Sequence, residues 1–536
     1  MDASTPLDLL FTGGTVFTGD AQAPTTTALG VAGGRVAALG SKAASAGARE
    51  VVDLAGGALL PAFRDGHVHP LGGGVELAEA PIRDCRSVEA VVEAVRRHAV
   101  AHPDTEWLRG GGFDPSLRTD GRFDARWLDA AVADRAVVLT TADHHSIWCN
   151  TEALRRAGID ATTPDPATGR IDRRADGSPL GTLVEWAAMA LVERHLPRRS
   201  VTDKQAGLAA ANALLAAAGV AWVQEAALSP EDVAVYLAAA ETGSLAPRAN
   251  IALRAEPGRW RQQLPRFVDA RAETQGSDAV SVRTVKFFAD GVVEHGTAAM
   301  LTPYADAGGC GHPVWPPDEL AAAVTAMDAA GFQAHIHAIG DAGVRVALDA
   351  IAAAAAANGP RDRRPVIAHV QVVHPDDLPR FAALDVIANV EPLWAQLDGV
   401  MVDLTLPRLG AERAGWQYPF ASLLAAGARL STGSDWPVSS HRPLDYLPVA
   451  VHRQTPSGQP PGGWLPQERL DLATVYAAAT RGVAYQAFDD DAGTLRAGMR
   501  ADLVQLPVDP FALTAEKLPE VEVLGTWVSG RQVHRS

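Results

Sequence analysis

Apolar and polar positions divide the central part of the chain into short apolar runs that alternate with alanine-rich segments. Runs of this kind, rich in β-branched residues and bounded by glycine, proline or charge, are typical of buried parallel strands. The segments between them, such as DELAAAVTAMDAAG and PDDLPRFAAL, are composed of helix formers. Eight strands are predicted, at residues 62–69, 219–226, 249–255, 282–290, 332–338, 365–371, 386–392 and 428–435.

Eight strands with intervening helices predict an α/β fold, a (β/α)8 TIM-like barrel, whose active site lies at the C-terminal ends of the strands. We assign this barrel domain to residues 59–488. The gap between the first two strands is far longer than one helix. Residues from about 75 to 205 are therefore predicted to form a long insertion, with helical pieces and an irregular loop at TTADHHSIWCN. Such an insertion often shapes the substrate pocket.

The two ends of the chain show alternating apolar positions between glycine turns, which is typical of β-hairpins. Examples are LDLLFTGGTVFTGD near the N-terminus and VLGTWVSGRQV near the C-terminus. Each piece alone is too small to bury a core. We therefore predict one small β-sandwich domain built from both chain termini, residues 1–58 plus 489–536.

Composition and charge argue against several classes of function for this protein. The 536 residues are 47% apolar and 21% charged, as in ordinary globular proteins. The net charge of −16 argues against nucleic acid or an anionic membrane as a partner. No run of about twenty apolar residues predicts a membrane span, and the acidic N-terminus does not resemble a signal peptide. Three scattered cysteines form neither a disulfide framework nor a CxxC motif. We expect a cytoplasmic protein with a small-molecule substrate, and leave a homodimer open.

Ionisable residues interrupt the apolar strands near their C-terminal ends. The first strand ends in His67 and His69, whose side chains point to one face because they are two positions apart. Two imidazoles side by side make half of a metal site, although an isolated pair is more often structural. Later strands add Lys286, His335, His337, His369 and Asp435. Buried ionisable groups are costly unless they are paired or bound to a metal, so one shared metal site explains the whole set best.

The sequence resembles the amidohydrolase superfamily and, within it, amidohydrolase family 3, which includes N-substituted formamide deformylase. The resemblance runs nearly from end to end, and the order of HxH, HAIGD and GSDWPV is highly specific. It rests on PAFRDGHVHPL, LTTADHHSIWCNTEAL, GTLVEWA, VKFFADG, HIHAIGDAG, IAHVQ, TGSDWPV and RADLVQL.

The resemblance implies two divalent metal ions, most simply zinc, with Lys286 and Asp435 in catalytic roles. Lys286, carboxylated by carbon dioxide, would bridge the ions, because a carbamate is an anionic oxygen donor and an ammonium is not. Asp435 would bind one metal and accept the proton of the attacking water. A single-metal site with unmodified Lys286 stays open. The implied metal ligands are His67, His69, Lys286, His337, His369 and Asp435.

The resemblance also suggests residues that contact substrate. The family motif places the metal ligand directly before Ala-Ile-Gly-Asp, so His337 is the ligand and His335 is assigned to the pocket. His145, in ADHHSIW, aligns with a motif at the barrel mouth and is expected to touch substrate. Trp394 and Trp436 are further candidates for the pocket wall, although most tryptophans are core residues.

Three positions depart from the family pattern. Ala62 stands where a glycine usually follows the first-strand proline. Arg64 stands where an apolar residue is usual, and we expect it to pack its stem on the helix layer. Ala368, before His369, replaces an acid that is common there, which leaves the surroundings of His369 undefined.

These expectations favour a metal-dependent hydrolase that cleaves a non-peptide C–N bond in a linear amide or an N-substituted formamide. Hydrolysis of an ester or a cyclic amide, deamination and decarboxylation at the same centre stay open. A metal-binding regulatory protein without turnover is a third reading. Asp435 argues against it, because a structural site needs no base beside an open metal position.

Overall fold

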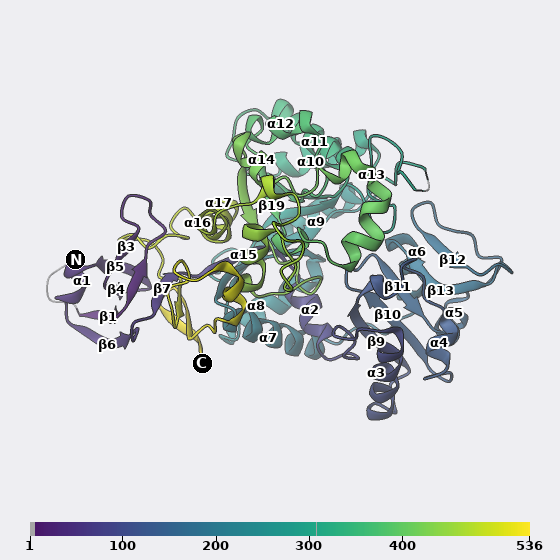
Figure 1. The fold of residues 1–536 in the computed structure, drawn as a ribbon, viewed down its shortest axis with the longest axis horizontal. Coiled ribbons are helices and arrows are strands. Elements are labelled where there is room, and N and C mark those ends of the chain that lie inside the picture. Colours follow the sequence, from purple (N-terminus) through teal and green to yellow (C-terminus); the bar gives the residue numbers. More distant parts are fainter. Residues whose placement is uncertain (1–5, 307) are drawn as a thin grey trace.

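The computed structural model describes residues 6–306 and 308–536, and its largest element is a barrel that lies between two smaller β regions (Figure 1). The strands nearest the two chain termini lie together at one end of the molecule, and the insertion lies at the other. The insertion therefore approaches the barrel from the side opposite the termini.

The barrel is an eight-stranded parallel sheet, and each strand coincides with a predicted apolar run. The loop after the last strand bonds to the C-terminal end of the first strand and so closes the barrel there. There the Asp435 amide donates to the His67 carbonyl at 2.7 Å, and the Ser434 amide donates to the Asp65 carboxylate at 3.0 Å. In spatial order the strands are β20 (Arg429–Thr432), β19 (Ile387–Val390), β18 (Val366–His369), β17 (Gln333–Ala338), β16 (Val280–Phe288), β15 (Arg248–Arg254), β14 (Val220–Leu228) and β8 (Phe63–Val68).

Helices follow the barrel strands along the chain, as the alanine-rich segments predict. α11 contains the tract of six alanines and ends at Gly359, whose φ of +71° suits glycine. Among the described residues, no helix is both long and apolar enough to cross a membrane. The helices between or after the barrel strands are α7 (Val201–Ala217), α8 (Val233–Glu241), α9 (Trp260–Glu273), α10 (Pro317–Ala329), α11 (Asp341–Asn358), α12 (Leu378–Ala383), α13 (Leu406–Ala414), α14 (Phe420–Ala425), α15 (Pro443–His452), α16 (Leu472–Ala477) and α17 (Val483–Gln486).

Strands from both ends of the chain form a separate pair of sheets. The link between the ends is β7 (Ala58–Pro61), which pairs with β2 (Thr15–Phe17) on one side and β21 (Leu503–Leu506) on the other. Phe11 and Trp527 pack edge to face at 5.0 Å in the core of this region. The boundaries 1–58 and 489–536 stay a prediction, and residues 1–5 lie outside the described residues. The remaining elements are β1 (Leu7–Thr12), β3 (Thr25–Thr26), β4 (Leu29–Ala32), β5 (Arg35–Leu39), α1 (Ser41–Ala44), β6 (Ala48–Asp53), β22 (Gly525–Val528) and β23 (Arg531–Arg535).

The insertion contains a five-stranded sheet, so the expectation of helical pieces around an irregular loop is wrong in this respect. The stretch TTADHHSIWCN includes the end of one strand, a turn and the next strand. Both faces of the sheet are buried: Val138 packs into one apolar cluster and its neighbour Val137 into another. This double burial removes the apolar–polar alternation that would reveal a strand. α2 (Pro70–Glu76) leads from the first barrel strand into the insertion. The insertion comprises α3 (Val88–Ala101), β9 (Trp107–Phe113), α4 (Ala125–Asp129), β10 (Ala136–Thr141), β11 (Ser146–Cys149), α5 (Thr151–Ala157), β12 (Arg170–Arg173), β13 (Pro179–Val184) and α6 (Trp186–Glu193).

Arg64 joins the first barrel strand to the C-terminal segment instead of lying along the helix layer as expected. Its side chain is 1% exposed and pairs with Asp489 and, at 3.6 Å, with Asp502. Its guanidinium also lies 4.8 Å from the ring centre of Trp222. The sequence could not show this arrangement, because both carboxylates lie more than 400 residues further along the chain.

Removal of the Arg64 side chain should destabilise the protein, because it leaves buried carboxylates without one of their cations. We expect Arg64→Ala to lower the free energy of unfolding by about 3 kcal/mol, measured by denaturant titration. Arg35→Ala is the control, since Arg35 is half exposed in its pair with Asp491 and should cost about 1 kcal/mol or less. Equal effects of the two substitutions would contradict this role of Arg64.

Candidate metal centre

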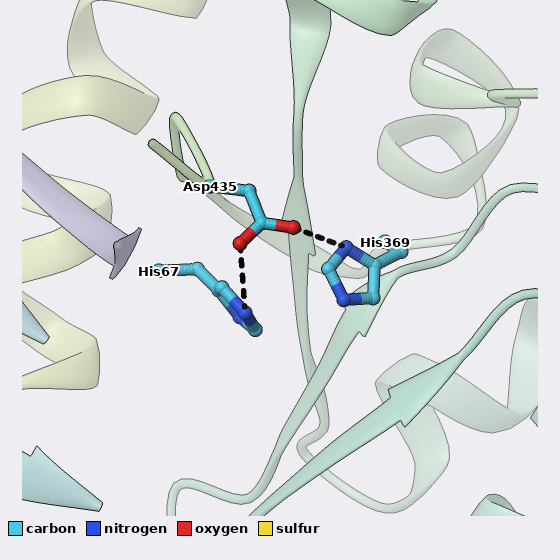
Figure 2. A group of neighbouring side chains, drawn as sticks. All are labelled: His67, His369 and Asp435. Atoms are coloured by element: carbon cyan, nitrogen blue, oxygen red, sulfur yellow. Dashed lines mark ion pairs between the residues drawn. The ribbon is translucent and has the colours of Figure 1, made fainter. Parts of the chain in front are cut away.

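The C-terminal ends of the barrel strands bring His67, His369 and Asp435 together, as Figure 2 shows. One ligand atom from each lies within 4.8 Å of the others, and all three residues are buried. Asp435 Oδ1 lies 3.6 Å from His67 Nε2, and Asp435 Oδ2 lies 4.0 Å from His369 Nδ1. Nitrogen and oxygen donors at this spacing can hold a divalent cation.

His69 and Lys286 belong to the same group. His69 Nε2 lies 3.2 Å from Asp435 Oδ1, and Lys286 Nζ lies 3.1 Å from His67 Nε2. The structure therefore collects five of the six predicted ligands around the Asp435 carboxylate. Their assignment as ligands stays a prediction.

The two histidines of β17 occupy different positions. His335 Nε2 lies 2.8 Å from His67 Nδ1, so His335 can hold the His67 ring while Nε2 of His67 faces Asp435. The His337 ring lies 4.6 Å from that of His369, and its Nε2 lies 3.2 Å from the Gly291 carbonyl. His337 is thus at the edge of the cluster, on the side of the insertion, and His335 lies behind His67.

The backbone is strained where it presents two of these side chains. His369 and Asp435 adopt φ values of +77° and +50°, and Val370 adopts +46°. Non-glycine residues rarely occupy this left-handed region, and such strain concentrates at functional sites. The ends of β18 and β20 are therefore shaped to direct their side chains into the mouth.

Burial sets the protonation states in the cluster. It lowers the pKa of His67, His335 and His337 well below the usual value, with nearby cationic groups adding to the effect, and it lowers that of His369 to about 3. These imidazoles are neutral, as metal ligands must be. Burial likewise lowers the pKa of Lys286 to about 7.

Within the cluster, His69 is the exception among the histidines. Burial lowers its pKa, but hydrogen bonding and attraction to Asp435 and Glu225 outweigh this and raise it to about 9. A metal bound at His69 would have to displace a proton, so metal affinity should rise with pH.

Several buried polar atoms of the cluster make no well-aligned hydrogen bond among the described residues, although some of them lie in close ion pairs with one another. They include Asp435 Oδ1, His369 Nδ1, His335 Nδ1, Glu225 Oε1 and both carboxylate oxygens of Glu391. Native proteins leave few such atoms unpaired. A divalent cation would compensate the carboxylates and bind the imidazoles, so these residues fit the predicted metal.

Two carboxylates in this group, Glu225 and Glu391, were not predicted. They lie in β14 and just after β19, and each is at most 1% exposed. Glu391 Oε2 is 3.1 Å from His369 Nδ1, and Glu225 Oε1 is 3.6 Å from His69 Nδ1. Glu391 supplies His369 with the carboxylate that Ala368 cannot. An acid within an apolar strand run was the available signal in both cases.

Residues 50–534 match the profile of the amidohydrolase family. The chain belongs to this family. It is 31% identical over 546 residues to Protein LONG AFTER FAR-RED 3 of Arabidopsis thaliana, with 98% of this chain and 91% of that protein covered. It is 26% identical over 551 residues to N-substituted formamide deformylase of Arthrobacter pascens, with 98% and 97% covered. An uncharacterized metal-dependent hydrolase from Pyrococcus horikoshii shares the fold, with a TM-score of 0.75, 23% identity, and 95% and 99% covered.

The resemblance that the sequence motifs predicted is thereby confirmed, and with it a hydrolase of the amidohydrolase superfamily. The barrel that carries the motifs is confirmed as well. The family does not fix the bond that is cleaved or the metal that is bound.

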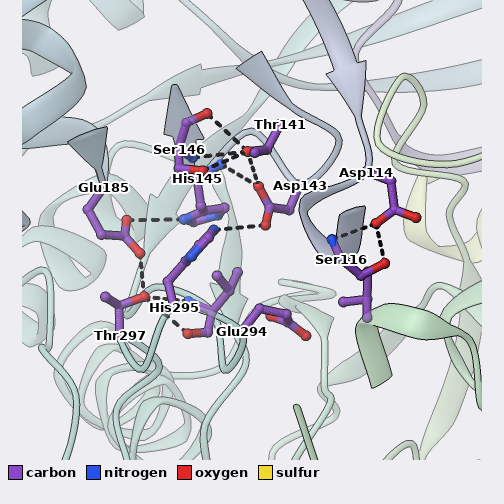
Figure 3. A network of polar contacts seen from close by, with 12 residues as sticks. Asp114, Ser116, Thr141, Asp143, His145, Ser146, Glu185, Glu294, His295 and Thr297 are labelled. Carbon is purple, nitrogen blue, oxygen red and sulfur yellow. Dashed lines mark hydrogen bonds and ion pairs between the residues drawn. The ribbon is translucent and has the colours of Figure 1, made fainter. Parts of the chain in front are cut away.

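The insertion of this amidohydrolase reaches the barrel mouth through a polar network, drawn in Figure 3. His145 Nδ1 lies 3.1 Å from Glu185 Oε2, and the His145 ring lies 5.7 Å from that of His337. Asp143 pairs at 3.0 Å with His295, which follows β16. Burial lowers the pKa of His145, but Glu185 and Asp143 outweigh it and raise the pKa to about 9. The insertion thus places a protonated imidazole beside the candidate metal centre.

The two predicted pocket tryptophans lie in different surroundings. Trp394 stacks on His369, with ring centres 5.2 Å apart and planes at 10°. Trp436 is 5% exposed and packs so closely on Gly73 of α2 that a Cβ there would lie 2.6 Å from the indole. Trp394 therefore contacts the cluster, whereas Trp436 is part of the core. Substrate binding by either residue stays a prediction.

Glu391 should strengthen metal binding through its contact with His369. Burial and the nearby Asp435 raise the pKa of Glu391 well above its usual value, and a bound cation would favour its ionised form. We expect Glu391→Gln to lower metal affinity about 10- to 100-fold, because the amide keeps the shape of the side chain and cannot ionise. Competition with a chromophoric chelator measures this. Glu294→Gln is the control, since Glu294 accepts a hydrogen bond from Thr405 outside the cluster. Unchanged affinity in the Glu391 variant would contradict the assignment.

Proposed function

We propose that this amidohydrolase hydrolyses a non-peptide C–N bond, in a linear amide or an N-substituted formamide, at a centre of two zinc ions. The proposal rests on one observation: neutral imidazoles, Lys286 and buried carboxylates without well-aligned hydrogen bonds gather around Asp435 at the barrel mouth. The similarity to N-substituted formamide deformylase supports the choice of bond. The proposed ligands are His67, His69, Lys286, His337, His369 and Asp435.

When bound, the divalent ions would polarise the scissile carbonyl and lower the pKa of a water molecule towards neutrality. Lys286 is suited to become the bridging carbamate, because burial lowers its pKa to about 7. Near neutral pH, much of this lysine is the unprotonated amine, the form that adds to carbon dioxide. A new N–C bond forms and one proton is released. The product is an anionic oxygen ligand.

Asp435 is the proposed base. Burial raises its pKa, but the hydrogen bond and charge of His69 outweigh this and hold the pKa below the usual value. The carboxylate is therefore ionised and able to accept a proton from the attacking water and pass it to the leaving amine. The protonated His145 is the proposed donor to the substrate carbonyl oxygen, and Trp394 a wall of the pocket.

The proposal predicts that metal-replete protein cleaves linear amides or formamides and loses this activity when the metal is removed. A panel of amides, N-substituted formamides, lactams and esters tests the bond, and elemental analysis should find about two metal ions per chain. Activity that persists in metal-free protein, or turnover of lactams or esters alone, would contradict it.

Asp435→Asn should abolish most turnover while the fold is kept. The amide preserves size and one oxygen ligand but cannot accept the proton, so we expect kcat to fall by at least about a hundredfold. Elemental analysis should show that the metal is largely retained. Near-normal kcat in a variant that holds its metal would place the base elsewhere.

A further inference from the structure

Glu225 lies directly behind His69, one of the proposed metal ligands, and turns a carboxylate oxygen towards it. Glu225 belongs to β14, its side chain is fully buried, and its Oε1 lies 3.6 Å from His69 Nδ1. The other ring nitrogen, His69 Nε2, lies 3.2 Å from Asp435 Oδ1. The His69 ring therefore has one nitrogen towards Glu225 and the other towards the group of proposed ligands around Asp435.

Two hydrogen bonds hold the other oxygen of this carboxylate. The hydroxyl of Tyr236, a fully buried residue of α8, donates to Glu225 Oε2, and the Leu71 amide donates to the same atom at 3.1 Å. Both donors bind Oε2, so Oε1 is left to His69. Among residues 6–306 and 308–536, Oε1 makes no well-aligned hydrogen bond. Tyr236 and Leu71 therefore set the orientation in which Glu225 faces His69.

The hydrogen bond from Leu71 also fixes the chain that follows His69. Leu71 lies in the first turn of α2, where backbone amides have no acceptor within the helix. Glu225 accepts one of these amides. Further along, α2 lies directly on α7, because a Cβ on Gly74 would collide with the Gly207 carbonyl oxygen. One carboxylate thus holds the start of α2 with Oε2 and faces the His69 ring with Oε1.

We propose that Tyr236 is a positioning residue of the metal centre. It holds Glu225 so that Oε1 accepts the Nδ1–H of His69, which directs His69 Nε2 towards the metal. Histidine ligands commonly donate their second ring N–H to a carboxylate, and this bond fixes the tautomer and the direction of the ring. Tyr236 would thus affect metal binding through Glu225 and His69. The inference rests on the proposed function only in that His69 is a ligand, and the bond that is cleaved does not enter it.

A double-mutant cycle on zinc affinity, measured by competition with a chromophoric chelator, tests the proposal. In Glu225→Gln the two donors would hold the amide oxygen and turn the NH2 group towards His69, so that a donor replaces the acceptor. Tyr236→Phe keeps the buried ring and removes only the hydroxyl. We expect each substitution to weaken zinc binding about 10- to 100-fold. The double variant should stay within about threefold of Glu225→Gln, because residues that act through one another are not additive.

Tyr304→Phe is the matched control. Tyr304 is also buried, and its hydroxyl donates to the Ala298 carbonyl at 2.8 Å in the loop after β16. Its removal should leave the zinc affinity of the wild type unchanged. Circular dichroism of the metal-free proteins shows whether each variant is folded. Should Glu225→Gln fail to fold, the comparison of Tyr236→Phe with Tyr304→Phe decides alone.

The possible outcomes separate this inference from the proposed function. Wild-type zinc affinity in Tyr236→Phe would overturn the inference and leave the proposed function intact. Losses in the two single variants that multiply in the double variant would overturn it too, because Tyr236 would then act independently of Glu225. A wild type that binds zinc but cleaves no amide or formamide would contradict the proposed function alone, and the cycle would still decide the role of Tyr236.

Discussion

The structure depends on one constraint: ionisable side chains are buried together at the barrel mouth, and the protein alone does not balance all of their charges. Lys286, Asp435 and Glu391 lie with four buried histidines where the barrel strands end, and several of their polar atoms make no well-aligned hydrogen bond among the described residues. Desolvation of this kind costs several kcal/mol for each unpaired ion. Strained backbone at His369 and Asp435 adds to the cost. The remainder of the barrel must offset this, and a bound cation would remove much of it.

The same constraint explains how much could be predicted from the sequence. Ionisable residues within apolar runs are conspicuous, so the eight strands and the gathering of these residues at the strand ends could be predicted together, whereas their roles as ligands stay a prediction. Glu225 and Glu391 carried the same signal inside VAWVQEA and VIANVEP, and only the structure shows that they face His69 and His369. The sheet of the insertion gave no such signal, since its strands are apolar on both faces. Whether Trp394 or Trp436 faces the cluster depends on the conformation of the loops that carry them. That conformation cannot be predicted from the presence of a tryptophan alone.

The sheets at the chain termini help to position the candidate metal centre, because one of their strands leads directly into the first barrel strand. β7 lies in the terminal sheet and directly precedes β8, the strand that presents His67. Arg64 in β8 pairs with Asp489 and Asp502, and the Tyr476 hydroxyl donates to the Pro61 carbonyl at 2.8 Å. The start of the first ligand strand is thus fixed by segments from the far end of the sequence. Hydrogen bonds and ion pairs between residues far apart in sequence thus fix the position of β8, which the secondary-structure propensity of its own residues does not determine.

The chemistry and the specificity of this amidohydrolase arise from different parts of the chain. Every proposed metal ligand lies on or directly after a barrel strand, whereas His145 and Trp186 belong to the insertion. Arg254 connects the two parts: it pairs in register with Lys286 on the neighbouring strand, and its guanidinium stacks on Trp186. Changes in the insertion could then alter the substrate while the strand ends, and with them the metal site, remain as they are.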